Sequence, residues 1–118
     1  MNRRKTGSKY EDMAAAYLDS QGIRIISRNF RSRYGEIDIV GHDGEYYIFF
    51  EVKYRKDNSS GDPIEAVDIR KQTRISRVSD YFRVCMKLKD TDNIRFDVIA
   101  ILGNDIRWYK NAFEYIQI

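Results

Sequence analysis

Two acidic residues and a lysine in the middle of the chain form a pattern that suits metal-assisted hydrolysis of a phosphodiester. Asp38 is followed by Glu51-Val52-Lys53, which fits the pattern D…E-x-K of Mg²⁺-dependent phosphodiesterases. Carboxylate oxygens and the Val52 carbonyl are the hard ligands that Mg²⁺ prefers, and the ion keeps its remaining positions for water and a phosphate oxygen. We therefore expect Asp38, Glu51 and Val52 to bind Mg²⁺, with Mn²⁺ as the alternative ion.

The residues around this ion have separate expected roles. The metal stabilises the charge that develops on the phosphoryl group and acidifies the attacking water. Lys53 lies one strand repeat beyond Glu51 on the same face, so it can orient that water or offset the negative charge as a compact cation. Glu11, from an earlier helix, could hold a water of the metal or a second ion. The candidate catalytic residues are Asp38, Glu51, Lys53 and Glu11.

The same triplet also has a plainer interpretation. Acidic-x-basic sequences are common on strands, and Asp38, Glu51 and Lys53 could form a solvated ion-pair patch between two strands. Taken alone, the triplet favours this patch over catalysis.

A β-hairpin is expected to bring the triplet together. Strand-type residues flank His42-Asp43-Gly44-Glu45, and Asp-Gly is among the strongest short-range turn signals. Side chains alternate between the two faces of a strand. The expected core face therefore carries Ile37, Ile39, Ile48, Phe50 and Val52, and the expected polar face carries Glu36, Asp38, Phe49, Glu51 and Lys53.

The length of the hairpin loop sets which acids face each other. A two-residue loop places Glu36 opposite Glu51, whereas a four-residue loop places Asp38 opposite Glu51. Either register puts the Asp38 and Glu51 carboxylates within roughly 5–8 Å, close enough to share a divalent cation. A slip by one residue would turn Ile37 and Ile39 to the polar face, so the apolar pattern argues against it.

Composition limits the remaining possibilities. The chain has 118 residues, so we expect one domain over residues 1–118. The single Cys85 excludes an intramolecular disulfide, no Cys/His cluster offers a zinc site, and the only histidine, His42, is expected in the turn as a solvated residue. The basic start is not followed by an apolar segment, so the sequence predicts neither a signal peptide nor a membrane span. We therefore expect a cytoplasmic protein.

The distribution of charge is more informative than the net charge of +3. Residues 1–35 hold eight Lys and Arg residues against three acidic residues. A basic lobe beside an acidic hairpin suits a polyanion held against a metal site. On charge alone, however, solubilising surface charge is the favoured interpretation.

The other elements complete an α/β pattern. Residues 8–21 have helical spacing, with Glu11 at the edge of the apolar stripe, and residues 23–30 alternate as a first strand. Strands are also expected over 94–102 and 106–109, and residues 111–118 are apolar enough to pack against the rest. The order α-β-β-β-α-β-β predicts a mixed sheet in which hairpin strands pair first and a helical crossover follows.

The second helix contains one unexpected residue. Asp62-Pro63-Ile64-Glu65 has the features of a helix N-terminus, with an N-cap and a capping-box glutamate. Lys71 falls in the middle of the apolar stripe of this helix, where a buried lysine needs a partner such as a carboxylate or a phosphate. The expected core face consists of Ile64, Val67, Ile75, Val78, Phe82 and Cys85.

Several of these segments together resemble a known family. The chain resembles the YraN-like bacterial proteins, which are similar to archaeal Holliday-junction resolvases and to the wider PD-(D/E)xK nuclease superfamily. The resemblance covers nearly the whole length. The matching segments are Gly7 and Glu11 with Ala14, Asn29-Phe30-Arg31, Gly35-Glu36-Ile37-Asp38, Phe50-Glu51-Val52-Lys53-Tyr54-Arg55, Lys71, Arg95-Phe96-Asp97-Val98 and Asn111-Ala112-Phe113.

The resemblance implies a restriction-endonuclease-like fold in which Asp38 and Glu51 bind metal, Lys53 is catalytic and Glu11 completes the acidic cluster. Ile37 stands where the superfamily name has proline, but this position supplies no ligand. Tyr10 replaces a glycine that commonly precedes the helix glutamate, which could shift the first turn and the position of Glu11.

The expected function is a Mg²⁺-dependent DNA endonuclease with a preference for branched DNA. Symmetric cleavage of a four-way junction needs two sites related by a two-fold axis, so this hypothesis predicts a homodimer. One alternative is a nucleic-acid-binding module with the same fold and no turnover, and another is a protein-interaction domain with a solvated acidic face. The residues expected to contact DNA are Arg31, Arg33, Arg55, Lys71 and Arg74.

Overall fold

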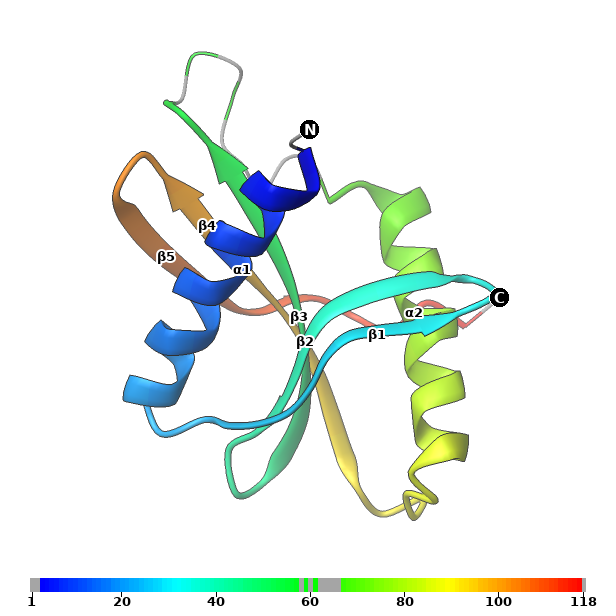
Figure 1. Cartoon of the computed structure of the whole chain (residues 1–118). Coiled ribbons are helices and arrows are strands. Elements are labelled where there is room, and N and C mark those ends of the chain that lie inside the picture. Colours follow the sequence, from blue (N-terminus) through cyan, green and yellow to red (C-terminus); the bar gives the residue numbers. More distant parts are fainter. Residues whose placement is uncertain (1–2, 58, 60, 62–66, 118) are drawn as a thin grey trace.

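A five-stranded mixed sheet lies between two helices in the computed structural model, which describes residues 3–57, 59, 61 and 67–117 (Figure 1). The element order α-β-β-β-α-β-β and the α/β restriction-endonuclease-like fold expected from the sequence are both confirmed. The elements are α1 (Arg3–Ser20), β1 (Arg24–Ser32), β2 (Gly35–His42), β3 (Tyr46–Arg55), α2 (Ile69–Cys85), β4 (Asn93–Leu102) and β5 (Asp105–Phe113).

The sheet is built on the parallel pair β3 and β4. The strands run in the order β1-β2-β3-β4-β5, and all neighbouring pairs except β3 and β4 are antiparallel. β3 and β4 pair from Tyr46↔Asn93 to Arg55↔Leu102. Parallel neighbours need a crossover connection, and α2 lies in it, as the sequence predicted.

The hairpin between β2 and β3 adopts the register of the four-residue loop. Backbone pairing runs from His42↔Tyr47 to Ile39↔Phe50, so Asp38 and Glu51 are the next residues on the two strands. The Asp43 side chain accepts hydrogen bonds from the backbone N–H groups of Glu45 and Tyr46, at 2.8 and 2.6 Å. His42 Nδ1 accepts one from Gly44 N at 3.0 Å, but His42 is the last residue of β2 and pairs with Tyr47, so it ends the strand and is half-buried rather than being the solvated turn residue expected.

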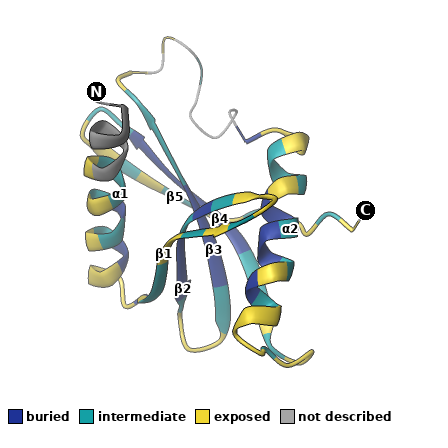
Figure 2. Ribbon diagram, turned by 45° about the vertical axis from the view of Figure 1, so that its right-hand side comes forward, coloured by how far each residue is buried: buried dark blue, intermediate teal, exposed yellow. Residues whose placement is uncertain are grey.

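Both faces of the central strands are buried, one beneath each helix (Figure 2). The expectation that Ile37 and Ile39 share one core face is wrong. Ile37 packs with Phe49 and with α2, whereas Ile39 packs with Phe50 and with α1. Before Ile39, β2 pairs with β1 but not with β3. This two-stranded part of the hairpin twists strongly towards α2, as two-stranded ribbons do (Figure 1). Ile37 and Ile39 therefore face different helices although they are two residues apart.

Helix α2 differs from its prediction at its start and in the exposure of one expected core residue. Residues 62–66, where we expected the helix to begin, lie outside the described residues, and the described helix begins at Ile69 with Asp68 as N-cap. The predicted core residues Val67, Ile75, Val78 and Phe82 are buried. Cys85 is exposed, contrary to prediction, because it is the last residue of the helix and lies beyond the last buried turn.

The segment after β5 packs along α2, as its apolar residues predicted. The expected strand 106–109 extends to Phe113, and the following residues bind α2. Ile116 N donates a hydrogen bond to Ser76 Oγ at 3.0 Å, and the Tyr115 hydroxyl donates to Asp80 at 2.8 Å. Within the described part of the chain, neither helix is long and apolar enough to cross a membrane.

The Arg-Phe-Asp-Val segment of β4 contains a fully buried carboxylate. Asp97 is 0% exposed and accepts four hydrogen bonds. Arg95 donates twice, from Nε and Nη2 at 2.9 Å each, Trp108 Nε1 donates at 2.8 Å, and Asn111 N donates at 2.9 Å. Because these donors come from β4 and β5, Asp97 joins the two strands where their register shifts between Phe96 and Val98.

Candidate active site

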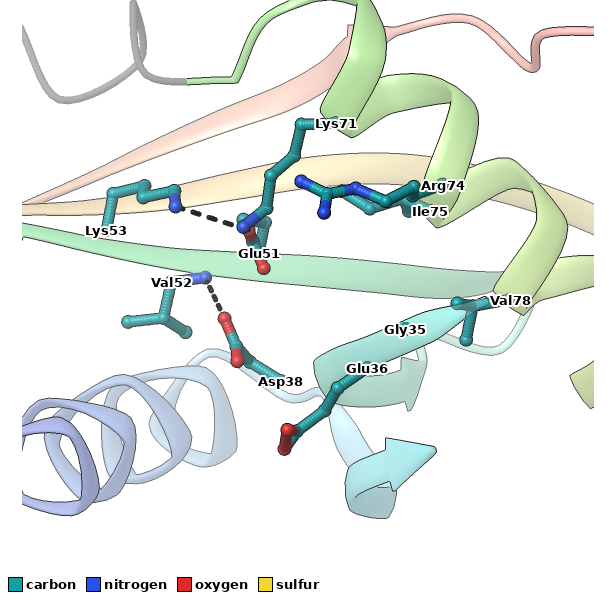
Figure 3. A pocket seen from close by; sticks show the side chains of 10 residues that line it. All are labelled: Gly35, Glu36, Asp38, Glu51, Val52, Lys53, Lys71, Arg74, Ile75 and Val78. Atoms are coloured by element: carbon teal, nitrogen blue, oxygen red, sulfur yellow. Dashed lines mark hydrogen bonds and ion pairs between the residues drawn. The ribbon is translucent and has the colours of Figure 1, made fainter. Parts of the chain in front are cut away.

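The triplet expected from the sequence lies in one pocket between the hairpin and α2. The pocket has a volume of about 280 Å³, and Figure 3 shows the side chains that line it. Its lining residues are Gly35, Glu36, Asp38, Glu51, Val52, Lys53, Lys71, Arg74, Ile75 and Val78. Strands β2 and β3 supply the acids and the first lysine, and α2 supplies the second lysine and the arginine.

Asp38 is fixed at the point where backbone pairing between β2 and β3 ends. Its Oδ2 accepts a hydrogen bond from Val52 N at 2.7 Å, so the side chain takes the place of the next backbone partner. Burial raises the pKa of Asp38 to about 9, and the negative charge of Glu51 and a hydrogen bond to Glu51 add to the increase. Asp38 therefore carries a proton at neutral pH unless a cation binds beside it.

Glu51 is a buried carboxylate that two lysines neutralise. Only 3% of the residue is exposed. Its Oε2 lies 2.9 Å from Lys71 Nζ and 3.4 Å from Lys53 Nζ. Glu51 is therefore the partner that a lysine in the apolar stripe of the helix was expected to need. Of the two expected kinds of partner, a carboxylate or a phosphate, the structure shows the carboxylate. A solvated acidic patch, the plainer interpretation of the triplet, does not describe this buried group.

The two lysines respond to the pocket in opposite ways. Burial lowers the pKa of Lys53, and the positive charge of Lys71 lowers it further, although Glu51 acts in the other direction. Burial also acts to lower the pKa of Lys71, but Glu51 and Asp38 outweigh this effect, so the pKa of Lys71 is raised. Lys53 is thus the lysine that loses its proton more easily, and Lys71 is the one held as a cation.

The donor atoms of the pocket fit a magnesium ion. Asp38 and Glu51 offer hard carboxylate oxygens. In an extended strand the N–H and C=O of one residue point to the same edge, so the Val52 carbonyl lies on the edge where Val52 N meets Asp38. Burial is the main cause of the high pKa of Asp38 and the charge of Glu51 adds to it, so a cation bound beside Asp38 would favour its ionised form. Within the described residues, no group of three or more His, Cys, Asp or Glu side chains is arranged to hold a metal ion.

Glu11 lies near the pocket but does not line it. Its carboxylate is 3.9 Å from Arg28 Nη2, while Arg28 binds Asp12 more closely, at 2.7 Å. Burial raises the pKa of Glu11, and its charge contributes to the raised pKa of Asp38, so the two carboxylates interact at a distance. The structure thus places Glu11 outside the pocket lining, but near enough for its charge to act on Asp38.

The five residues expected to contact DNA do not all reach the pocket. Lys71 and Arg74 line it, and Figure 3 shows the side chain of Arg74 pointing toward Glu51. Arg31 pairs with Glu36 at 3.5 Å, and Arg33 lies against the Tyr34 ring. The described contacts of Arg55 include a hydrogen bond to the Tyr54 carbonyl at 3.4 Å, and its Nε is buried with no hydrogen-bond partner among the described residues.

Glu36 is the lining acid that the sequence analysis left out of the site. It lies two residues before Asp38 in the same strand, and strand alternation assigned both to the expected polar face, so the sequence contained a signal for it. In Figure 3 its carboxylate points away from Asp38 and Glu51. Ile75 and Val78 were predicted as core residues and also form one wall of the pocket.

The sheet, its two covering helices and the acidic pocket define an α/β protein of the restriction-endonuclease-like class. A family model described as "Uncharacterised protein family UPF0102" matches residues 10–101. The chain therefore belongs to the UPF0102 family, which confirms the YraN-like resemblance inferred from its motifs.

Three curated relatives show the extent of the similarity. A UPF0102 protein of Lachnoclostridium phytofermentans is 44% identical over 97% of this chain and 97% of its own length. One from Syntrophus aciditrophicus is 45% identical over 93% of this chain and 89% of its own length. A third, from Fusobacterium nucleatum, is 40% identical over 94% of this chain and 92% of its own length.

Proposed function

We propose that this UPF0102 protein is a Mg²⁺-dependent DNA endonuclease of the PD-(D/E)xK type, which hydrolyses phosphodiesters and prefers branched DNA. The observation that carries the proposal is the convergence of Asp38, Glu51 and Lys53 on one pocket, with Glu51 buried and Asp38 at a raised pKa. Perturbed pKa values in a concave site are a feature of functional centres. Mn²⁺ is the alternative ion.

Each residue of the pocket has a role in the proposed reaction. Asp38, Glu51 and the Val52 carbonyl would hold the metal, which supplies Lewis-acid stabilisation of the phosphoryl charge and acidifies water. Lys53, whose pKa is lowered, can accept a proton from the attacking water and so act as the general base. Lys71 and Arg74 stay cationic and contact the phosphate. The Val52 N–H keeps the Asp38 carboxylate in a fixed orientation.

The proposed preference for branched DNA requires two copies of the chain. Two symmetric cuts in a four-way junction need two active sites related by a two-fold axis, so the active form is proposed to be a homodimer. Sedimentation of the chain with and without a junction tests this part separately from the cleavage chemistry.

The second candidate function is a nucleic-acid-binding module without turnover. It is supported by the two ammonium groups on Glu51, because an acid that already has two cationic partners can serve as a structural ion pair. Such a module would bind DNA in a salt-dependent and largely sequence-independent manner.

A cleavage assay separates the two candidates. Labelled four-way junction, flap, linear duplex and single-stranded DNA are incubated with the chain and Mg²⁺ or Mn²⁺. Lys53→Ala and Glu51→Ala are run in parallel, with Lys89→Ala as a control at an exposed lysine before β4. An endonuclease cuts with metal, loses cutting in both pocket variants and keeps it in the control. Retained binding without cutting on any substrate would support the binding module instead.

A further inference from the structure

We propose that Lys71 is a built-in cation that occupies Glu51 until a metal ion binds there, and that it then moves to the phosphate of the substrate. The inference rests on the proposed function, because it assigns Lys71 a part in binding both the metal and the phosphodiester. Its starting point is the pairing of Lys71 Nζ with Glu51 Oε2 at 2.9 Å, closer than the 3.4 Å between Lys53 Nζ and the same oxygen.

The position of Lys71 in α2 indicates that its positive charge is compensated by Glu51 and not by the helix itself. Lys71 lies in the first turn of the helix, and its N–H donates to the N-cap Asp68 at 2.9 Å. The positive end of the helix dipole disfavours a cation there, and this first turn contains no acidic residue. The ammonium group therefore depends on the buried carboxylate of Glu51 for its compensation.

The charges in the pocket make Lys71 and the metal ion compete for the Glu51 carboxylate. Lys53 and Lys71 already place two positive charges beside Asp38 and Glu51. A divalent cation on the same carboxylates would add two more at short range, where repulsion in a buried site is strong. One ammonium group must withdraw from Glu51, or an anion must enter.

Lys71 is better suited to withdraw than Lys53. Lys53 follows Glu51 by two residues in β3, so both side chains start from the same face of one strand and stay neighbours. Lys71 belongs to a separate element, and 29% of its side chain is exposed, against 21% for Lys53. Arg74 lines the same pocket from the same helix (Figure 3), so a released Lys71 and Arg74 can bind one phosphate between them.

The exchange links the two ligands of the site. If metal binding frees Lys71 for a phosphate, then a bound phosphate strengthens metal binding by the same factor. The chain would therefore bind metal weakly alone and more tightly with DNA, and Lys71 would be the residue that carries this coupling.

The test measures Mn²⁺ affinity by titration calorimetry on the full chain without DNA. Lys71→Met is expected to bind Mn²⁺ about tenfold more tightly than wild type, which corresponds to ~1.4 kcal/mol. Arg74→Met removes the same charge from the same pocket and helix, but Arg74 makes no ion pair with Glu51 among the described residues, so this variant is expected to change the affinity little. Equal tightening in both variants, an unchanged or weaker affinity in Lys71→Met, or no binding by any of the three proteins would overturn the proposal.

A second measurement uses the wild-type chain and does not depend on the folding of a variant. In ¹⁵N-lysine NMR spectra, Mg²⁺ is expected to shift the Nζ resonance of Lys71 more than that of Lys53, and an unmoved Lys71 signal at saturating Mg²⁺ contradicts the exchange. The two proposals fail separately. Tighter metal binding by Lys71→Met with no DNA cleavage by wild type would refute the endonuclease alone, and cleavage with unchanged metal affinity would refute the exchange alone.

Discussion

Lys71 of α2 and Glu51 of β3 form a 2.9 Å ion pair that joins the second helix to the central strand inside the pocket. A buried carboxylate whose partner is removed is costly, so the pair ties the position of α2 to the position of the acidic triplet. It also excludes the interpretation of the Glu51 face as simply solvated, because that face lies beneath α2.

The first prediction concerns pH and Asp38. Its pKa of about 9 in the folded chain is above its ordinary value of 3.8, so the stability it contributes is fully present below about pH 4 and is lost as pH rises through about 9. Asp38→Asn removes this loss and keeps an acceptor for Val52 N. In EDTA, the melting temperature of wild type should fall more steeply than that of Asp38→Asn between pH 6 and 9.

The control for this prediction is Asp105→Asn, at an exposed acid in the first position of β5, which should follow the wild-type curve. Parallel curves for wild type and Asp38→Asn would contradict the raised pKa. Under the proposed function, Mg²⁺ should raise the melting temperature of wild type more at pH 8 than at pH 6, because metal and proton compete for the same carboxylate. Asp38→Asn should lose most of this stabilisation.

The sequence predicted the elements and most of the site because both depend on local pattern. Alternating residues and the Asp-Gly turn placed Asp38 near Glu51, and the motif spacing placed Lys53 beside it. The turn signal did not determine the loop length, so only the pairing Ile39↔Phe50 in the structure selects the register. The helical position of Lys71 predicted a partner without identifying it, because the partner lies on another element.

The errors came from properties that depend on the whole fold. Ile37 and Ile39 obey strand alternation, but the twist of the hairpin directs them to different helices. Cys85 obeys the helical period, but the helix ends there and the residue is exposed. Glu36 lines the pocket and Glu11 does not. Both outcomes depend on the twist of β2 and on where α1 packs against the sheet, which periodicity does not specify.

The second prediction separates structural from functional acids in the shared motifs. Asp97 is 0% exposed and accepts four hydrogen bonds, two of them from the Arg95 guanidinium. Asp97→Ala should lower the free energy of unfolding by about 3–5 kcal/mol, because Arg95 and the other donors lose their buried partner. Urea denaturation measures the loss, with Asp105→Ala as the exposed control. If Asp97→Ala and Asp105→Ala lower the free energy of unfolding by similar amounts, the Asp97 carboxylate is not required to hold β4 and β5 together.

The third prediction tests whether the pocket faces a polyanion. Arg74 is exposed and lines the pocket from α2. If it contacts a DNA phosphate, Arg74→Ala should weaken binding uniformly across DNA sequences and lower the slope of log affinity against log salt concentration by about 1. Fluorescence anisotropy with a labelled four-way junction in EDTA, at several NaCl concentrations, gives that slope without cleavage. Lys89→Ala, in the turn before β4, should keep the wild-type slope. A slope in Arg74→Ala equal to that of wild type would mean that DNA does not pass over this side of α2, and the phosphate-binding role assigned to Lys71 and Arg74 would fail with it.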